Sequence, residues 1–403
     1  MSENISNEIG TPFQPSNPVR PENFKGRSDI VHKIIRYIPN ALNNEAQHFF
    51  LTGNKGMGKT SISDYIINYV EDEYNLATSY TSNKGNNSID ILASKILINL
   101  LNNMPKESRR QKVKTWFGEH VSELEVIGTT LRFNVDPQKQ EKIRQDFIIY
   151  LNQAYEDLKK YYNGLLIVID DINGLSDSRK FVEWYKQLAD TIIVDKHYQI
   201  PVYFLLIGYP EKFDKLVELE TSFGRIFYTD NIDELTDHEV EEFFEDTFKT
   251  IGVTIEDDAL KLMTQYSSGV PLTMQQIGDS IFWNLTKNEI KLSEAKNGIK
   301  EAAQELGKRQ IRRVLTHVKT PEHEKILLKM GENKLSTFTQ EDIKEIMTQQ
   351  EQEILPEFIN KMLQIGMIKV VDEWDNTTEY EFTEKTFYTY YNITSSKELL
   401  KAV

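Results

Sequence analysis

The amino-acid sequence predicts an α/β fold: a parallel sheet flanked by helices, then a small helical domain, then a C-terminal domain of helices and two strands. Two uninterrupted apolar runs, at 165–169 and 202–207, have the composition of strands that are buried on both faces. Such runs alternate along the chain with segments that repeat apolar residues at helical spacing. This alternation is typical of a parallel sheet that helices cover on both faces.

The elements of the sheet region follow a polar start. Residues 1–21 contain four prolines and few bulky apolar side chains, which predicts a flexible arm. We therefore expect order to begin near Phe24. The next predicted elements are a strand at 48–52, a helix at 61–70, a strand at 76–81 and a helix at 89–101.

The second half of the chain predicts two further domains. Thr236 followed by Glu239 is a capping-box pattern at the start of a helix, and helical periodicity continues to about 306. From about 309, three short helices and two strands around a polar turn at 372–378 predict a winged helix. The predicted domains are an arm at 1–21, a core at 22–232, a helical lid at 233–307 and a winged helix at 308–403.

The composition excludes several kinds of chemistry. The 403 residues include no cysteine, which excludes disulfides, thiol catalysis and cysteine-ligated metal sites. The seven histidines show none of the spacings of a metal site. No apolar run approaches the roughly 18 residues of a membrane span, and residues 1–21 lack a secretory pattern. We therefore expect a cytoplasmic protein without a membrane partner.

The most specific motif is a glycine-rich loop after the strand predicted at 48–52. The sequence GNKGMGKT at 53–60 matches G-x-x-x-x-G-K-[ST], the phosphate-binding loop (P-loop) of ATPases and GTPases. Its glycines let backbone N–H groups surround phosphates, and the next helix directs its N-terminus at the same anion. We expect Lys59 to reach the β- and γ-phosphates and Thr60 to ligate Mg²⁺. The predicted binding residues are Gly53, Asn54, Lys55, Gly56, Met57, Gly58, Lys59, Thr60 and Ser61.

Two carboxylates follow the buried run at 165–169. In a fold with a phosphate-binding loop, the end of this strand lies beside the loop. Asp170 is therefore predicted to hold Mg²⁺, and Asp171 to polarise the attacking water. The alternative is that both residues only end a strand and begin a turn, as Asp often does.

With these motifs the chain resembles the AAA+ and STAND ATPases, specifically the branch related to archaeal and eukaryotic replication-initiator ATPases. The segment 23–29 (NFKGRSD) is similar to the box that opens these ATPase domains, which implies that Gly26 and Arg27 help to enclose the base. The pair Asp170–Asp171 is closer to STAND proteins, because standard AAA+ members have Asp-Glu. The resemblance favours ATP over GTP, since no N/T-K-x-D guanine motif follows the run at 202–207.

Two further elements carry the resemblance. Arg225 lies where AAA+ proteins place an arginine finger that acts in a neighbouring subunit, although a lone Arg is more often a surface residue. Gly269 and Pro271 resemble the G-x-P element of STAND lids, which implies a contact with the nucleotide. The alternative for this pair is a turn with Pro at a helix start.

Two departures from the family pattern concern its sensor residues. No Arg stands near Pro271, and the run at 202–207 ends in Gly208–Tyr209 where a polar sensor is usual. We therefore expect slow hydrolysis, and a nucleotide switch more than a fast motor.

The distribution of charge bears on nucleic-acid binding. The net charge is −15, and residues 341–390 carry 12 acidic and 4 basic side chains. Phosphate contacts need Lys and Arg, so we expect a winged helix that faces protein. For the segment 106–114 and the hairpin arm predicted at 126–135, a solvated surface is favoured over a DNA contact. The basic candidates for DNA are Lys308, Arg309, Arg312, Arg313 and the segment 106–114.

The sequence leaves three functions open. The favoured one is an oligomerising, slowly hydrolysing Mg²⁺-dependent ATPase that passes its nucleotide state to a protein partner. By family analogy such a switch serves anti-phage defence or mobile-element biology. The alternatives are a DNA-loading ATPase of the initiator or transposition-regulator type, and a nucleotide-binding scaffold without turnover.

Overall fold

The computed structural model divides the chain into two compact units. The sheet unit comprises Arg27–Gly53 and Lys59–Ile232, and the helical unit comprises Met1–Gly26, Asn54–Gly58 and Asp233–Val403. The residues that the structure describes are 10–15, 17–21, 24–85, 88–106, 108–109, 112, 125–127, 130–132, 137–311, 314, 316, 320–374 and 377–400.

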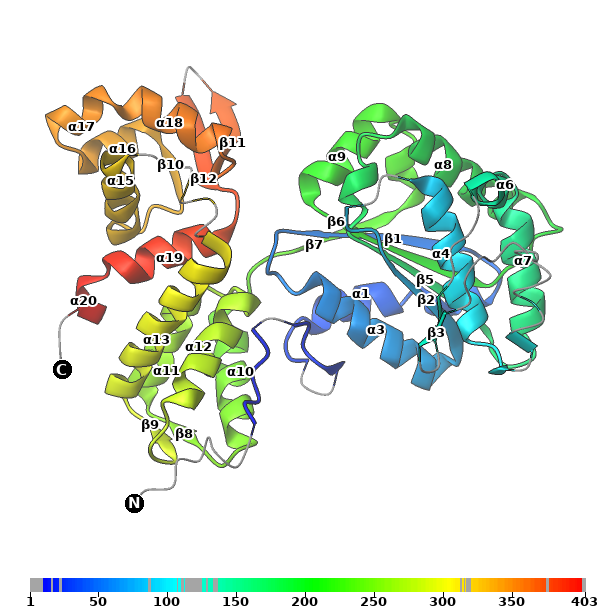
Figure 1. Ribbon diagram of the computed structural model, residues 1–403, viewed down its shortest axis with the longest axis horizontal. Helices are drawn as coiled ribbons and strands as arrows, with labels where there is room; N and C mark the ends of the chain where they lie inside the picture. Colours follow the sequence, from blue (N-terminus) through cyan, green and yellow to red (C-terminus); the bar gives the residue numbers. More distant parts are fainter. Residues whose placement is uncertain are drawn as a thin grey trace. The chain divides into compact units, whose positions relative to one another are not determined.

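The sheet unit contains a five-stranded sheet with the strand order β2-β5-β6-β1-β7 (Figure 1). All four pairings are parallel, which confirms the predicted fold class. Strands β5 and β6 are buried along their whole length, because their apolar side chains meet helices on both faces. The strands are β1 (Gln47–Gly53), β2 (Leu76–Ser82), β5 (Gly164–Asp170), β6 (Val202–Gly208) and β7 (Tyr228–Ile232).

Helices cover both faces of this sheet (Figure 1). On one face, Phe50, Ile167 and Phe204 share a core with α4, α7, α8 and α9. On the other face, the Tyr203 hydroxyl donates to the carbonyl of Ile34 in α1 at 2.8 Å. The helices are α1 (Ser28–Ile35), α2 (Ile38–Leu42), α3 (Lys59–Tyr74), α4 (Ile89–Asn102), α6 (Pro137–Gln145), α7 (Phe147–Leu158), α8 (Arg179–Val194) and α9 (Pro210–Leu219).

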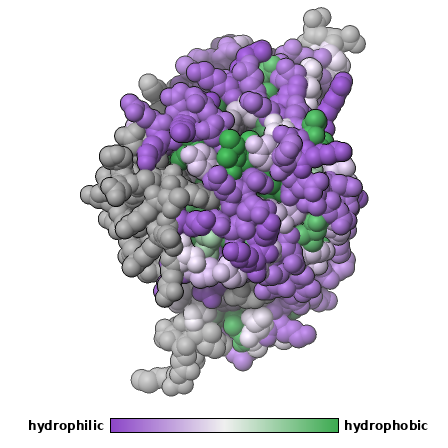
Figure 2. Space-filling view, turned by 90° about the vertical axis from the view of Figure 1, so that its right-hand side faces the viewer, coloured by the Kyte–Doolittle hydropathy of each residue, from purple (hydrophilic) through white to green (hydrophobic). Residues whose placement is uncertain are grey.

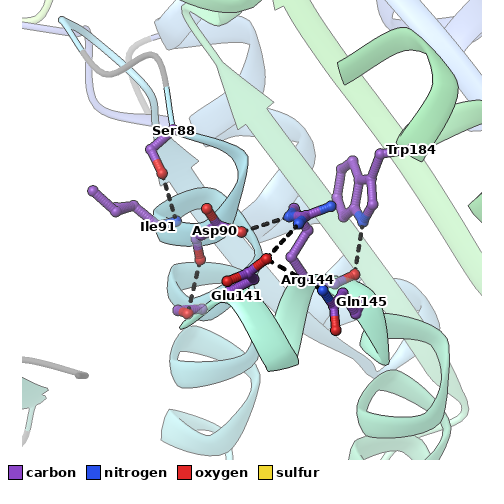
Figure 3. A network of polar contacts seen from close by, with 8 residues as sticks. Ser88, Asp90, Ile91, Glu141, Arg144, Gln145 and Trp184 are labelled. Carbon is purple, nitrogen blue, oxygen red and sulfur yellow. Dashed lines mark hydrogen bonds and ion pairs between the residues drawn. The ribbon is translucent and has the colours of Figure 1, made fainter. Parts of the chain in front are cut away.

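The segment between β2 and β5 is longer than a simple crossover and is fixed to the core by polar contacts (Figure 3). Arg144 of α6 pairs with Asp90 of α4 at 2.5 Å, and its backbone carbonyl accepts the Trp184 indole N–H at 3.1 Å. Strands β3 (Glu125–Ile127) and β4 (Thr130–Arg132) form an antiparallel pair, as the hairpin prediction requires.

Two bases of the segment 106–114 are used inside the sheet unit. Arg109 is buried and donates to two backbone carbonyls in the preceding segment, at 2.6 and 2.8 Å. Lys112 pairs with Asp157 at 2.8 Å. Both contacts favour a structural use of these side chains over a contact with DNA.

The surface and the helices carry no sign of a membrane-spanning element in the part of the chain that the structure describes. None of its helices is long and apolar enough to cross a membrane. The face drawn in Figure 2 is mostly hydrophilic, with hydrophobic residues that lie singly or in small groups. Single exposed apolar side chains are normal on globular proteins.

The helical unit begins with a four-helix region that has its own core. The predicted capping box is present: Thr236 accepts from the Glu239 backbone N–H, and the Glu239 carboxylate accepts from the Thr236 backbone. The elements are α10 (Asp237–Lys249), β8 (Thr254–Ile255), α11 (Asp257–Ser267), α12 (Pro271–Trp283), β9 (Glu289–Ile290), α13 (Leu292–Leu306) and a π-helical turn, η5 (Gly307–Ile311).

The N-terminal segment joins this core earlier in the chain than the sequence predicts. Phe13 is 2% exposed and its ring lies 4.9 Å from the ring of Phe248. A Cβ atom at Gly278 would lie 2.2 Å from the Phe13 ring, so the absent side chain makes room for it. Order therefore begins before Phe24, because one buried aromatic ring outweighs a polar composition.

The C-terminal part combines helices with a three-stranded antiparallel sheet of order β10-β12-β11 (Figure 1). The predicted helices and strands are present, and the sequence analysis missed β10, α17, α19 and α20. Whether this part is a winged helix in the functional sense stays a prediction. Its elements are α15 (Pro321–Glu332), β10 (Thr337–Thr339), α16 (Gln340–Ile346), α17 (Gln349–Glu353), α18 (Leu355–Gln364), β11 (Ile368–Trp374), β12 (Thr377–Phe382), α19 (Lys385–Ser395) and α20 (Lys397–Leu400).

A buried histidine in β1 makes stability depend on pH. His48 lies with its Nδ1 2.8 Å from the Tyr185 hydroxyl and its ring stacked on Phe204. Burial lowers the pKa of His48 to about 3. The unfolded chain, with a histidine pKa of about 6.5, binds a proton that the folded protein excludes. The free energy of unfolding therefore falls as pH falls from 6.5 toward 3.

We predict that His48 costs the protein about 2 kcal/mol of unfolding free energy between pH 7 and pH 5. Urea unfolding at both pH values measures this loss, and the loss disappears in His48→Gln. The exposed His32 supplies the matched control His32→Gln, which keeps the wild-type pH dependence. Parallel pH curves for the wild type and His48→Gln contradict the prediction.

Candidate functional site

The phosphate-binding loop connects the end of β1 to the start of α3. Gly56 and Gly58 have φ angles of 83° and 85°, a left-handed backbone that favours glycine at both positions. Met57 and Ser61 are both buried, and Ser61 is in the first turn of α3. The structure therefore gives 53–60 the strand–loop–helix context in which backbone N–H groups and a helix N-terminus bind an anion.

Lys59 and Thr60 are the first two residues of helix α3, and their side chains contact different partners. The Lys59 Nζ donates to the Gly53 carbonyl at 2.7 Å and lies 4.7 Å from the centre of the Tyr209 ring. The Thr60 hydroxyl donates to a carboxylate oxygen of Asp170 at 2.8 Å. The predicted lysine, hydroxyl and carboxylate thus lie together at the carboxyl ends of β1 and β5.

Asp170 has a second hydrogen-bond donor that the sequence analysis missed. The Tyr80 hydroxyl, from β2, donates to the same Asp170 oxygen at 2.8 Å. Burial, and next the Asp170 charge, raise the pKa of Tyr80 well above its usual value, so it stays protonated. Burial and Asp170 also raise the pKa of Asp64. The sequence feature that could have indicated Tyr80 is a tyrosine near the end of β2, the strand that pairs with β5, which ends at Asp170.

Asp171 is held by a residue three positions after the buried strand. Its backbone is left-handed (φ 57°), a conformation that Asp tolerates better than most residues. The Asn173 side-chain amide donates to the Asp171 carboxylate, and the Asn173 amide oxygen accepts the Tyr209 backbone N–H at 3.0 Å. Asn173 thus connects the ends of β5 and β6, at the place where the sequence showed no polar sensor.

The residues Thr60 and Asp170 fit a magnesium ion by their chemistry. Mg²⁺ usually takes one or two protein oxygens and completes its shell with water and phosphate oxygens. A hydroxyl and a carboxylate 2.8 Å apart supply such a pair. Within the described ranges, no group of three His, Cys, Asp or Glu side chains forms a metal site of another kind.

Gly26 and Arg27 lie at the junction before α1. Both have a left-handed backbone, with φ of 72° and 64°. A Cβ at Gly26 would lie 2.7 Å from the Leu235 side chain, and Arg27 is buried at the start of α1. These packing constraints account for the pair, and a contact with the base stays a prediction.

The Gly269–Pro271 element is explained locally by the turn before α12. The Leu235 N–H donates to the Gly269 carbonyl at 2.9 Å, and a Cβ at Gly269 would lie 2.3 Å from the Leu235 oxygen. Gly269 also has φ 66°, so only glycine fits without strain. Pro271 is at the first position of the helix, as its fixed φ favours.

The tip of the phosphate-binding loop contacts two other parts of the helical unit. The Leu272 N–H, in the first turn of α12, donates to the Gly56 carbonyl at 3.3 Å. The Lys55 Nζ lies 3.1 Å from both carboxylate oxygens of Glu384, just before α19. A Cβ at Gly58 would lie 3.9 Å from Pro271. The loop therefore touches the predicted lid and the C-terminal part within one unit.

The remaining predicted residues are less constrained. Arg225 is exposed on the short helix η4 (Phe223–Ile226), so its role as a finger stays a prediction. Lys308 and Arg309 both pair with Glu305, at 2.8 and 3.4 Å, which weakens them as a DNA contact. Arg312 and Arg313 lie outside the described residues.

The sequence was compared with protein families and with curated proteins. The sequence pattern of the KAP family P-loop domain matches residues 27–182, a range that includes the loop at 53–60 and the pair Asp170–Asp171. No curated protein matches the sequence.

Solved structures match almost the whole chain at low identity. The Walker-type ATPase PABY2304 of Pyrococcus abyssi has 16% identity and a TM-score of 0.52, and the match covers 92% of this chain and 97% of that one. The ORC2 protein of Aeropyrum pernix, solved as ADPNP–ADP complexes, has 11% identity and a TM-score of 0.55, with 95% and 98% covered. Cdc6p of Pyrobaculum aerophilum has 14% identity and a TM-score of 0.50, with 96% and 97% covered.

Similarity at these identities establishes the fold, whereas the functional residues rest on the local geometry. The family match and the loop geometry together support nucleotide binding. The chain therefore carries a P-loop nucleoside-triphosphatase domain in the fold of the Cdc6p and ORC2 structures.

Proposed function

We propose that the protein is a slowly hydrolysing, Mg²⁺-dependent ATPase that acts as a nucleotide switch for a protein partner. The observation that carries the proposal is the joint position of Lys59, Thr60 and Asp170 beside a loop whose tip contacts α12 and Glu384. The first part is the equipment to bind a nucleotide triphosphate. The second part is a pair of contacts within the helical unit, from the tip of the loop to α12 and to Glu384.

The chemistry of the proposed reaction follows from the side chains at the two strand ends. Lys59 neutralises charge on the β- and γ-phosphates, while Thr60 and Asp170 hold the metal ion. Bound Mg²⁺ neutralises charge that develops on the phosphate oxygens. Asp171, oriented by Asn173, accepts a hydrogen bond from the attacking water and polarises it. Tyr80 holds the Asp170 carboxylate in one orientation.

Slow turnover is supported by the residues at the two positions where AAA+ proteins have sensor residues, after β6 and near Pro271. Tyr209, after β6, presents its ring to Lys59 and its backbone N–H to Asn173. The ring stabilises the charge of the lysine at a position where the family pattern has an Asn or Thr sensor. No Arg lies near Pro271 in the sequence. A site with these gaps is better suited to hold a nucleotide than to turn it over rapidly.

The switch is proposed to work through the tip of the loop. A phosphate bound by the loop competes for its backbone N–H groups and for the charge of Lys55. The contacts of Gly56 with Leu272 and of Lys55 with Glu384 then respond to the nucleotide state. Since exposed ion pairs contribute only about 0–1 kcal/mol, this link biases the equilibrium and does not lock it.

The partner in the proposal is a protein, and the active form is an oligomer. Exposed Arg225 is free to act in a neighbouring subunit as a finger. The acidic C-terminal part disfavours DNA, and the described bases Lys308 and Arg309 are engaged by Glu305. By analogy with similar ATPases, such a switch serves anti-phage defence or mobile-element biology.

We predict that Lys59→Ala and Asp171→Asn separate binding from turnover. Lys59→Ala lowers both ATP affinity and phosphate release, because it removes the charge at the phosphates. Asp171→Asn keeps ATP affinity and lowers the turnover rate by about 10²-fold or more, since it removes the base. Phosphate release and binding of a fluorescent ATP analogue measure the two effects, with Lys249→Ala on the exposed end of α10 as control. A wild type that binds ATP and never releases phosphate leaves only the scaffold function.

We predict that Glu384→Gln raises the turnover rate about two- to fivefold, because it releases Lys55 from an ion pair of modest strength. Glu332→Gln breaks the exposed pair with Lys397 in the same unit and serves as the matched control. If Glu384→Gln and Glu332→Gln have the same small effect, the loop contact does not control the switch.

We predict that Arg225→Ala lowers ATP turnover by about 10³-fold, as expected of an arginine finger. Mixing Arg225→Ala with Lys59→Ala restores part of the activity, because each protein supplies the residue that the other lacks. The exposed Arg179→Ala is the control, and turnover as a function of protein concentration reports assembly. Full activity of a monomer, or no recovery on mixing, rules out a finger in trans.

A further inference from the structure

One face of the C-terminal sheet, opposite the core, has an unusual set of side chains. Phe338 and Tyr380 pair across β10 and β12 and are buried in the core of this part. Residues that alternate with them in β12 therefore project to the other face, and so do their partners in β11. We call this surface the acid–aromatic face, and it comprises Lys369, Asp372, Trp374, Thr377, Glu379 and Glu381.

Exposed apolar side chains gather on strand β11, the edge strand of this sheet. Of the nine large hydrophobic residues that are exposed in the described part of the chain, three are in this strand: Val370, Val371 and Trp374. Trp374 is 46% exposed. Val370 pairs with the core residue Tyr380, so the exposed apolar side chain of the acid–aromatic face is that of Trp374.

The same strand pair carries uncompensated negative charge. The only base of the acid–aromatic face, Lys369, is already paired with Glu381 at 2.9 Å. Among the described residues, Asp372, Glu373 and Glu379 have no cationic partner. Edge strands are often protected by charges and bulges, and a register shift is present between Val370 and Asp372. Protection of an edge, however, gives no reason to expose a tryptophan on the same face as these carboxylates.

We propose that the acid–aromatic face binds an extended, Lys/Arg-rich segment of a partner protein. Unpaired carboxylates beside an exposed indole ring suit a guanidinium or ammonium group, which forms ion pairs with Asp372 and Glu379 and stacks on Trp374. The outer backbone groups of the edge strand β11 pair with an extended chain. Nucleic acid is repelled by the same carboxylates.

This inference rests on the proposed function, because the basic segment would belong to the protein partner that receives the nucleotide state. The surface itself is formed by strands of the C-terminal sheet. Binding at this face is therefore measured separately from ATP turnover, and the two proposals fail separately.

The test uses the full-length protein and a fluorescein-labelled peptide of 12 residues that alternates Arg and Thr. Fluorescence anisotropy is expected to show binding that weakens as salt increases. Trp374→Ala and the double variant Asp372→Lys with Glu379→Lys each weaken binding about tenfold or more, and Trp374→Phe weakens it less. The matched control, Asp214→Lys with Glu218→Lys on exposed positions of α9, changes the net charge equally and binds within about twofold of the wild type.

Several outcomes overturn the proposal. Equal binding by the wild type, the Trp374→Ala variant and the double variant shows that the peptide binds elsewhere or only by net charge. A wild type that ignores the peptide but self-associates in sedimentation, with loss of association in Trp374→Ala, shows that the occupant is a second copy of the chain. Duplex DNA that competes for the face also overturns it. Phosphate release, unchanged in these variants, confirms that the nucleotide site is intact.

Discussion

The Asp170 carboxylate is the interaction on which the nucleotide site depends. It ends a strand that is buried along its whole length, where an unpaired charge would be strongly unfavourable. Thr60 and Tyr80 donate to one of its oxygens from α3 and β2, so one carboxylate fixes the ends of three elements. Without the Tyr80 hydroxyl, the Thr60 hydroxyl alone orients this carboxylate among the side-chain contacts of the described residues. A buried carboxylate needs hydrogen-bond donors in any folded chain, and the same hydrogen bonds set the positions of Thr60 and Asp170 in the proposed nucleotide site.

The order of the strands explains why the residues after β6 matter to this site. Strand β6 lies between β1, which leads into the phosphate-binding loop, and β5, which ends at Asp170. Whatever follows β6 is therefore beside both. Here Tyr209 follows, with its ring at Lys59 and its backbone N–H on Asn173. Asn173, from the β5 side, supplies a polar group at this position and orients Asp171.

Sequence patterns predicted the elements that have a strong local cause. The apolar runs at 165–169 and 202–207, the glycine-rich loop and the capping box at Thr236 depend on side chains close together in the chain. The missed features depend on distant partners. Phe13 is buried because Gly278 leaves space for its ring, and Tyr80 is recognisable only when the sheet order sets β2 beside β5. Strand β10 has three residues, too few for a period to appear.

The glycine before α12 illustrates how a motif shared with a family can have a purely structural cause. Gly269 is fixed by its left-handed backbone and by the close approach of the Leu235 carbonyl, which needs no nucleotide. The residue of this element that contacts the phosphate-binding loop is the one after Pro271, because the Leu272 N–H donates to the Gly56 carbonyl. An N–H in the first turn of a helix has no partner within the helix, so the loop satisfies it. In the proposed switch, a loop that reorients around a phosphate gives up or renews this hydrogen bond, and this is the route by which α12 would respond to the nucleotide.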